Sequence, residues 1–379
     1  MKKTALTAGL LLTPLFAAAQ PLNATAGEFS GDFRLRYETH QSDQQKKDAT
    51  ALTLRSRIGY QSPVFAGVSL LAEAEDVAAL IDEYTPQDNR YLTVADPQNR
   101  EINRAQLHYQ QQQLAATFGR QRIILDNARF IGNVGWRQNE QTYDAALVRY
   151  NAADFELTYA YLDQVNDIFF GATEVDSHVI HIKNHSADAA RLSAYAYWLD
   201  FDDSAVYYHS YGTSLSGDTE LAGINSHYRA EIAYQSADNG DDREALYYRL
   251  EAGITLKHSR LTLGNETLGS DAGDYGFQTP LATKHAFNGW ADRFLKTPDR
   301  GLSDNYLSLS YRLTAFNALA VYHRYYSDRG HDELGGETNL KLGYNASKQL
   351  NLGIKYADFN GVAGQADSQK FWLWTQLSF

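Results

Sequence analysis

The 379-residue sequence contains no cysteine, seven prolines and one methionine. Without cysteine there is no disulfide scaffold, no thiolate metal site and no cysteine nucleophile. After the first 20 positions there is no run of about 18 uncharged apolar residues, which argues against a helical membrane protein. The net charge of -12 argues against a general nucleic-acid binder, because such proteins carry a basic surface. Aromatic residues, in contrast, make up 13% of the chain, and with scarce proline they favour extended strands.

The first residues have the order of a secretory signal peptide. Met1, Lys2 and Lys3 form a positive start, residues 5–16 are an apolar stretch too short to span a bilayer comfortably, and residues 17–19 are small. We predict a signal peptide over residues 1–19, with an alternative cut after residue 26, and a single domain over residues 27–379. A buried amino-terminal helix is the alternative, which the order of the three regions disfavours.

From residue 29 onward, apolar and polar side chains alternate with a period of two, as in strands with one face of each kind. In the first strand, Phe33, Leu35 and Tyr37 share one face, whereas Arg34 and Arg36 point to the other. The pattern predicts 18 strands, which begin near Phe29, Leu52, Val68, Asn103, Leu114, Tyr143, Phe155, His178, Ala190, His209, Ser226, Leu246, Arg260, Asp304, Ala318, Glu337, Leu350 and Lys370.

The predicted connections alternate between long polar loops and short turns. The long loops are residues 40–51, 77–102, 122–142, 163–177, 200–208, 236–244, 269–303, 327–336 and 360–369. The short turns are residues 61–67, 110–113, 151–154, 184–189, 218–225, 258–259, 314–317 and 346–349. This asymmetry predicts an all-β fold, a transmembrane antiparallel β-barrel of the bacterial outer membrane with 18 strands, long extracellular loops and short periplasmic turns.

Such a sheet has to close, because in hydrocarbon every backbone N–H and C=O needs an internal partner. A soluble β-sandwich is the alternative, but it does not explain the two kinds of connection. The last strand agrees with a barrel, since Phe371, Leu373, Leu377 and Phe379 share a nearly apolar face. A terminal Phe on such a strand resembles the signal read by the barrel assembly machinery. We therefore expect that machinery, outer-membrane lipid and lipopolysaccharide as partners, and a barrel of this size can stand alone as a monomer.

If the apolar faces meet lipid, the opposite faces line the lumen. The predicted inner wall has eleven cations, Arg34, Arg36, Arg55, Arg57, Arg104, Arg229, Arg249, Arg312, Arg324, Lys341 and Lys355. It has eight carboxylates, Asp32, Glu38, Glu73, Glu75, Glu156, Glu231, Glu251 and Glu266. The difference of +3 (11 minus 8) favours anions. The four arginines of the first two strands could pass an organic anion from site to site, or pair with Asp32, Glu38, Glu73 and Glu75 and stiffen the wall.

Two segments are candidates for the constriction of so wide a barrel, residues 119–144 and 269–301. The first contains Gly119-Arg120-Gln121, Ala128-Arg129-Phe130-Ile131-Gly132 and Trp136-Arg137-Gln138, and the second contains His285-Ala286-Phe287-Asn288-Gly289-Trp290-Ala291-Asp292. Both resemble characteristic stretches of the alginate export family of outer-membrane proteins. The resemblance implies an 18-stranded barrel with an anion-selective pore, in which Arg34, Arg55, Arg57, Arg120, Arg129 and Arg137 lie at the pore or its constriction.

A dedicated alginate exporter would be expected to have a strongly electropositive conduit, whereas the predicted wall is mildly basic. We therefore predict a porin for passive diffusion of an anionic solute, such as a uronate oligomer or an organic acid, in preference to polymer export. The predicted pore-lining or solute-binding residues are Arg34, Arg36, Arg55, Arg57, Arg104, Arg120, Arg129, Arg137 and Arg249.

No catalytic residue, cofactor or metal site is predicted. His178 and His181 have an odd separation on a strand, so they point to opposite faces and cannot chelate one ion. No phosphate loop, dinucleotide fingerprint or nucleophile elbow occurs. The alternative to a channel is an outer-membrane enzyme or a surface-binding barrel without an open pore.

Overall fold

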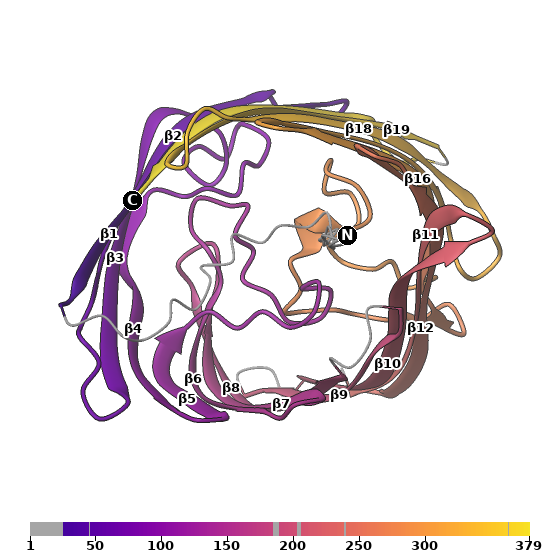
Figure 1. The fold of residues 1–379 in the computed structure, drawn as a ribbon. Coiled ribbons are helices and arrows are strands. Elements are labelled where there is room, and N and C mark those ends of the chain that lie inside the picture. Colours follow the sequence, from indigo (N-terminus) through magenta and orange to yellow (C-terminus); the bar gives the residue numbers. More distant parts are fainter. Residues whose placement is uncertain (1–25, 45, 185–188, 203–205, 239, 363) are drawn as a thin grey trace.

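The computed structural model describes residues 26–44, 46–184, 189–202, 206–238, 240–362 and 364–379. Eighteen antiparallel strands form one closed sheet, because β1 pairs with both β2 and the last strand, β20. Figure 1 shows this sheet as a ring. The strands are β1 Glu28–Ser42, β2 Ala49–Gln61, β3 Val68–Glu83, β4 Asn99–Gln111, β5 Leu114–Gln121, β6 Thr142–Asn151, β7 Phe155–Asn166, β8 Ala172–Asn184, β9 Arg191–Phe201, β10 Val206–Leu221, β11 Ile224–Asp238, β12 Asp242–Thr255, β13 Ser259–Leu268, β16 Leu302–Leu313, β17 Phe316–Tyr326, β18 Glu333–Asn345, β19 Leu350–Gly361 and β20 Ser368–Ser378.

The predicted barrel of 18 strands is confirmed, and the sandwich alternative is wrong because the sheet has no free edge. Each predicted strand start lies inside an observed strand or directly before it. The predicted signal peptide, residues 1–19, lies outside the described residues. No helix in the described part of the chain is long and apolar enough to cross a membrane.

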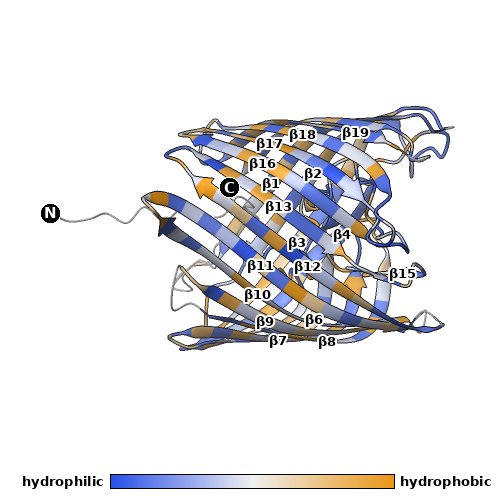
Figure 2. Cartoon of the chain, turned by 90° about the vertical axis from the view of Figure 1, so that its right-hand side faces the viewer, coloured by the Kyte–Doolittle hydropathy of each residue, from blue (hydrophilic) through white to orange (hydrophobic). Residues whose placement is uncertain are grey.

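The barrel is apolar outside and polar inside. Large apolar side chains such as Leu250 and Leu263 point outward and are 56% and 66% exposed, whereas charged side chains such as Arg36 and Glu337 point inward and are at most 1% exposed. Figure 2 shows the resulting mixture of hydrophobic and hydrophilic positions along each strand. An apolar surface of this extent is stable only against hydrocarbon, and closure pairs the backbone groups that lipid cannot satisfy. The protein is therefore located in the bacterial outer membrane.

Three connections at one end of the barrel are long, and the prediction that all nine are long is wrong. The long ones are residues 84–98, 122–141 and 269–301, whereas the other six span six residues or fewer. For example, β7 ends at Asn166 and β8 begins at Ala172, where the sequence predicts a loop over 163–177. Strand pairing continues into water beyond the lipid belt, where neither face has to be apolar and the alternation that reveals a strand is lost.

The three long connections fold into the barrel, and we call them the inward loops. Figure 1 shows the loops over 122–141 and 269–301 inside the ring. The latter contains the hairpin of β14 Ser270–Asp271 and β15 Tyr275–Gly276 and the short 3-10 helix η1 Lys284–Ala286. These two loops are the predicted constriction candidates. The loop over 84–98 is not among them, and its Leu92 and Val94 pack with Ala49 and Ala51 of the inner face of β2.

Candidate functional site

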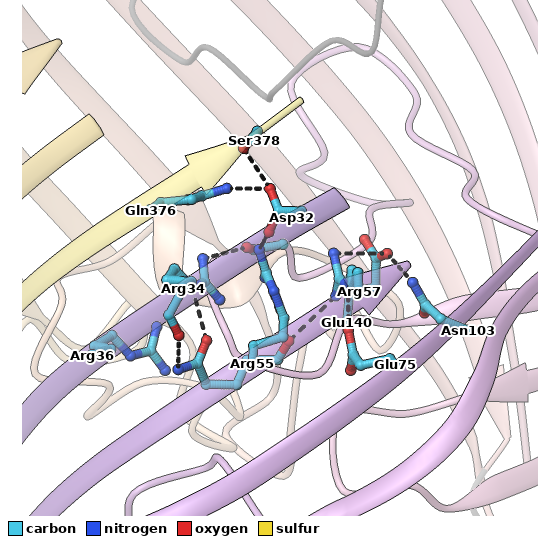
Figure 3. A network of polar contacts seen from close by, with 12 residues as sticks. Asp32, Arg34, Arg36, Arg55, Arg57, Glu75, Asn103, Glu140, Gln376 and Ser378 are labelled. Atoms are coloured by element: carbon cyan, nitrogen blue, oxygen red, sulfur yellow. Dashed lines mark hydrogen bonds and ion pairs between the residues drawn. The ribbon is translucent and has the colours of Figure 1, made fainter. Parts of the chain in front are cut away.

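Four arginines of the first two strands, which we call the arginine ladder, lie side by side on the inner face (Figure 3). Arg34 and Arg36 come from β1 and Arg55 and Arg57 from β2, because alternate residues of a strand share a face. Arg34 and Arg55 are direct cross-strand partners. All four side chains are buried, with at most 6% of each residue exposed. Burial of so many like charges requires compensation by carboxylates or hydrogen-bond acceptors.

Neighbouring carboxylates provide part of this compensation. Arg55 contacts Asp32 and Arg57 contacts Glu75, in both cases across adjacent strands. Arg57 Nη1 also lies 3.2 Å from Oε1 of Glu140, which belongs to the inward loop over 122–141. Of the two roles left open by the sequence, pairing with the wall is therefore the one that this part of the ladder adopts.

Gln138 of the same inward loop provides the rest. Its Oε1 accepts a hydrogen bond from Arg34 Nε at 2.8 Å, and its Nε2 donates to Thr53 Oγ1 at 2.8 Å and to the Arg34 carbonyl at 3.2 Å. Its own carbonyl accepts from Arg57 Nη2 at 3.3 Å and from Arg55 Nη1 at 3.5 Å. The ladder thus holds this loop against the barrel wall, a role that the pattern of charges in the sequence does not reveal.

Arg36 joins two inward loops to the wall. Its Nη1 donates to the carbonyl of Trp136 at 2.5 Å, and its Nη2 contacts Asp96 of the loop over 84–98. The other carboxylate oxygen of Asp96 accepts from the backbone N–H of Gln138 at 2.8 Å. Asp96 is fully buried, so these contacts fix the position of its loop.

Asp292, in the inward loop over 269–301, is the centre of a second network. Its Oδ2 lies 2.9 Å from Arg137 Nη2 and 2.7 Å from Lys370 Nζ, and its Oδ1 lies 2.6 Å from His285 Nδ1. Arg137 also reaches Glu38 of β1 at 3.2 Å. Burial would raise the pKa of Asp292, but the positive charges around it hold that pKa well below its usual value. Arg137 therefore links two inward loops and β1.

Arg129 connects the same two inward loops at a second place, beside β13. Its Nε lies 2.8 Å from Glu266 Oε1 of β13, its Nη1 donates to Thr279 Oγ1 at 3.0 Å, and its Nη2 donates to Asn288 Oδ1 at 3.2 Å. The guanidinium also lies 4.9 Å from the ring centre of Phe287. The two segments that carry the family resemblance thus meet at Arg129.

The remaining predicted site residues lie apart from one another. Arg104 is on the inner face and lies 2.6 Å from Glu73, and Arg249 is on the inner face of β12, 2.6 Å from Glu251. Arg120 does not line the lumen. It pairs in register with Ala105 on the outward face and makes a two-point contact with Asp144, at 2.8 and 2.9 Å. Its prediction as a pore residue is wrong because the strand places it on the other face.

The set of charged residues on the observed inner wall differs from the predicted set. Arg324 points outward, since its neighbours His323 and Tyr325 are the buried ones, and it pairs with Glu333 at 2.5 Å. Both faces of β17 are apolar along much of its length, so the pattern does not distinguish the inner face. Several charged residues not counted from the sequence lie on the inner face, among them Glu101, Asp304, Glu337 and Lys370. The predicted list of wall charges is therefore incomplete, and it contains one residue, Arg324, that points outward.

The two histidines of β8 are placed as the sequence predicts. His178 is outward and exposed, whereas His181 is inward and lies 2.9 Å from Asp126, so the two histidines do point to opposite faces. Within the described ranges, no group of three or more His, Cys, Asp or Glu side chains is arranged to hold a metal ion.

The contacts that Glu140 and Asp292 make with the cations of the wall are expected to survive mild acid. Burial would raise the pKa of Glu140, but Arg122 and Arg57 hold it well below its usual value, and Asp292 behaves likewise. A depressed pKa adds stability at every pH above the unfolded value, and that stability is lost only as the pH falls through the folded value. We expect the single-channel conductance to stay constant from about pH 7 to about pH 4. An increase between about pH 7 and about pH 5 would contradict this assignment.

Comparison with known proteins identifies the fold but no sequence relatives. No protein-family model matches the chain, and no curated protein matches it. Among solved structures, OccK9 (OpdG) of Pseudomonas aeruginosa superimposes with a TM-score of 0.74 and 13% identity over 93% of this chain and 98% of its own. OpdK of the same organism, solved with vanillate, gives 0.72 and 12% over 93% and 98%. OccAB1 of Acinetobacter baumannii gives 0.71 and 10% over 95% and 99%. These proteins are outer-membrane porins.

Proposed function

We propose that this protein is an outer-membrane channel through which a small anionic organic solute diffuses passively. The observation that carries the proposal is a set of cations inside the barrel that have no carboxylate partner among the described residues. Lys341 and Lys355 lie on the inner face, and Lys284 and Arg293 belong to the inward loop over 269–301. Unpaired cations on a polar inner wall favour the entry of anions, because the surrounding low-dielectric wall strengthens their field.

The solute that we propose is an organic acid or a short uronate oligomer. The structure solved with vanillate supports a small organic anion, since OpdK has the same fold. The resemblance to the alginate export family supports an acidic sugar. The arginine ladder argues against polymer export. Its guanidinium groups are bonded to Gln138, Asp32, Glu75 and Glu140, so they do not form a continuous row of unpaired positive charges.

The proposed partners follow from the barrel. Its apolar outer face would contact outer-membrane lipid and lipopolysaccharide, and the apolar face of β20 that ends in Phe379 would be recognised by the barrel assembly machinery during insertion. We propose a monomer without cofactor. We do not propose the alternative of an outer-membrane enzyme, because the proteins of similar fold are porins.

Single-channel recording tests this function. The purified protein in a planar bilayer under a salt gradient is expected to conduct steadily, with a reversal potential that shows chloride passing more readily than potassium. Replacing chloride by acetate should leave a measurable anion current. A barrel that does not conduct, or one that prefers potassium, would overturn the proposal.

A further inference from the structure

Lys341 and Lys355 are direct cross-strand partners of β18 and β19 on the inner face. Like charges at such a pair repel each other and destabilise a sheet. Arg34 and Arg55 form an equivalent pair, but Asp32 contacts Arg55 and Gln138 accepts a hydrogen bond from Arg34. Neither lysine has a carboxylate partner in the described part of the chain. A repulsive pair kept without compensation is the kind of local conflict expected at a functional site.

Lys355 is held by neutral groups. The residue is 5% exposed, and its Nζ donates a hydrogen bond to His285 Nε2 at 2.6 Å. The Nζ lies 3.8 Å from the ring centre of Trp290, 4.2 Å from that of Trp136 and 5.2 Å from that of Trp372. Ring faces attract a cation without cancelling its charge. The Lys355 ammonium therefore has no anionic partner among these contacts.

Hydrogen-bond donors around these lysines lack acceptors. The indole N–H groups of Trp136 and Trp372 and the side-chain amide nitrogen of Asn339 are buried and have no partner among the described residues. The amide of Asn339 is oriented, because its Oδ1 accepts from the backbone N–H of Trp290 at 3.1 Å. Asn339 is two residues from Lys341 on the same face of β18, and Lys341 itself donates to no described group. This region has an excess of donors.

The nearby carboxylates of Asp292 and Glu337 bond to other groups and not to these donors. Asp292 uses both oxygens for His285, Arg137 and Lys370, and Glu337 accepts from the backbone N–H of Ala291 at 2.8 Å. On the wall of β3 and β4 the unpartnered buried atoms are of the opposite kind, the oxygens Oε1 of Glu75, Oε1 of Glu101 and Oδ1 of Asn103. Arg36, Arg55 and Arg249 also have an unpartnered buried N–H, but each of these guanidinium groups contacts a carboxylate through another nitrogen, which Lys341 and Lys355 do not among the described residues.

We infer that Lys341, Lys355 and Asn339, with the indole N–H groups of Trp136 and Trp372, form a binding site for the carboxylate group of a solute. A carboxylate has two acceptor oxygens and one negative charge, so it supplies what this region lacks. Lys341 and Asn339 donate to it, and Lys355 attracts it through its field. The inference rests on the proposed function and adds to it the place where the anion is held.

Block of the chloride current by benzoate, at graded concentrations in planar bilayers, tests this site. Lys341→Gln is expected to raise the half-blocking concentration roughly tenfold or more, the usual effect of losing a hydrogen bond to a charged group. Lys341→Arg keeps the charge and the donors and is expected to stay within about threefold of the wild type. Arg312→Gln is the matched control, because it removes one inner-face cation from the turn end of β16, away from this site.

The possible outcomes distinguish a failure of the proposed carboxylate site from a failure of the proposed channel function. If Lys341→Gln and Arg312→Gln change the block equally, only the general field of the lumen is at work and the site is wrong. If Lys341→Gln changes nothing in an anion-preferring channel, the site is wrong and the proposed function stands. A wild-type barrel without anion preference would overturn the proposed function before any variant is compared. Heat-dependent gel migration shows that each variant is folded.

Discussion

Replacing Arg129 with leucine is expected to separate two inward loops and to raise the single-channel conductance several-fold. Arg129 is 2% exposed and is the point at which the loops over 122–141 and 269–301 are both tied to Glu266 of the wall. Its removal leaves the buried Glu266 without its cation, and breaking a buried pair in this way costs about 3–5 kcal/mol. A local loss of that size is enough to populate an open arrangement of the loops. The single-channel conductance in planar bilayers measures this opening of the loops directly.

Arg120→Leu is the matched control for this prediction. Arg120 also forms an arginine–carboxylate pair, with Asp144, but the pair lies on the outward face and contacts neither inward loop. We expect its conductance to equal that of the wild type. Equal conductance of the wild type and Arg129→Leu would show that Arg129 does not hold the loops, even if the barrel remained folded.

Replacing both Arg55 and Arg57 with glutamate is expected to reverse the ion preference and to release the inward loop over 122–141. The change makes the wall more negative by 4 charges (from +2 to -2 at these positions) directly beside Asp32, Glu75 and Glu140. The carbonyl of Gln138 also loses two donors. The sequence alone predicts only the altered field, whereas the structure adds a change of conductance, because the arginines anchor the loop.

A charge swap separates the two effects. Arg57→Glu combined with Glu75→Arg keeps the net charge and the salt bridge between β2 and β3 but moves the guanidinium away from Gln138. We expect this variant to keep the anion preference while conducting more than the wild type. Reversal potentials report the preference, and single-channel amplitudes report the loop. If the double variant with Arg55→Glu and Arg57→Glu reversed the preference at unchanged conductance, the ladder would face the permeation path and its anchoring role would be wrong.

The architecture can be predicted from the sequence because it depends on local repetition. In a strand between lipid and water, apolar and polar side chains must alternate. Phe33, Leu35 and Tyr37 therefore identify the outer face of β1, and Arg34 and Arg36 identify the inner face. The same logic fails where the two faces do not differ, which is why the sequence places Arg324 inside. It also fails at strand ends beyond the lipid belt, where the observed strands run further than the apolar pattern.

The candidate site can be predicted only in part. The sequence identifies two of the segments that enter the barrel, and Arg129 and Arg137 within them. Gln138, Asp292 and Asp96 carry no signal of their own in the sequence, since a glutamine or an aspartate in a polar loop is ordinary. Their importance comes from partners about 40 to 160 residues away, such as Asp96 for Gln138 and Arg137 for Asp292.

The sequence by itself determined the closed barrel, its strand number and the division into an apolar outer and a polar inner face. Each follows from the period of two in the side chains, because every strand that crosses the membrane must present apolar side chains to lipid on one face. Only the tertiary structure decided which cations of the inner face are bonded to acceptors of the wall or the loops and which have no such partner among the described residues. Whether a cation is neutralised depends on which loop residues fold back beside it, as Gln138 does beside Arg34 and none does beside Lys341 among the described residues. That choice is made by contacts between distant segments, which no local pattern encodes.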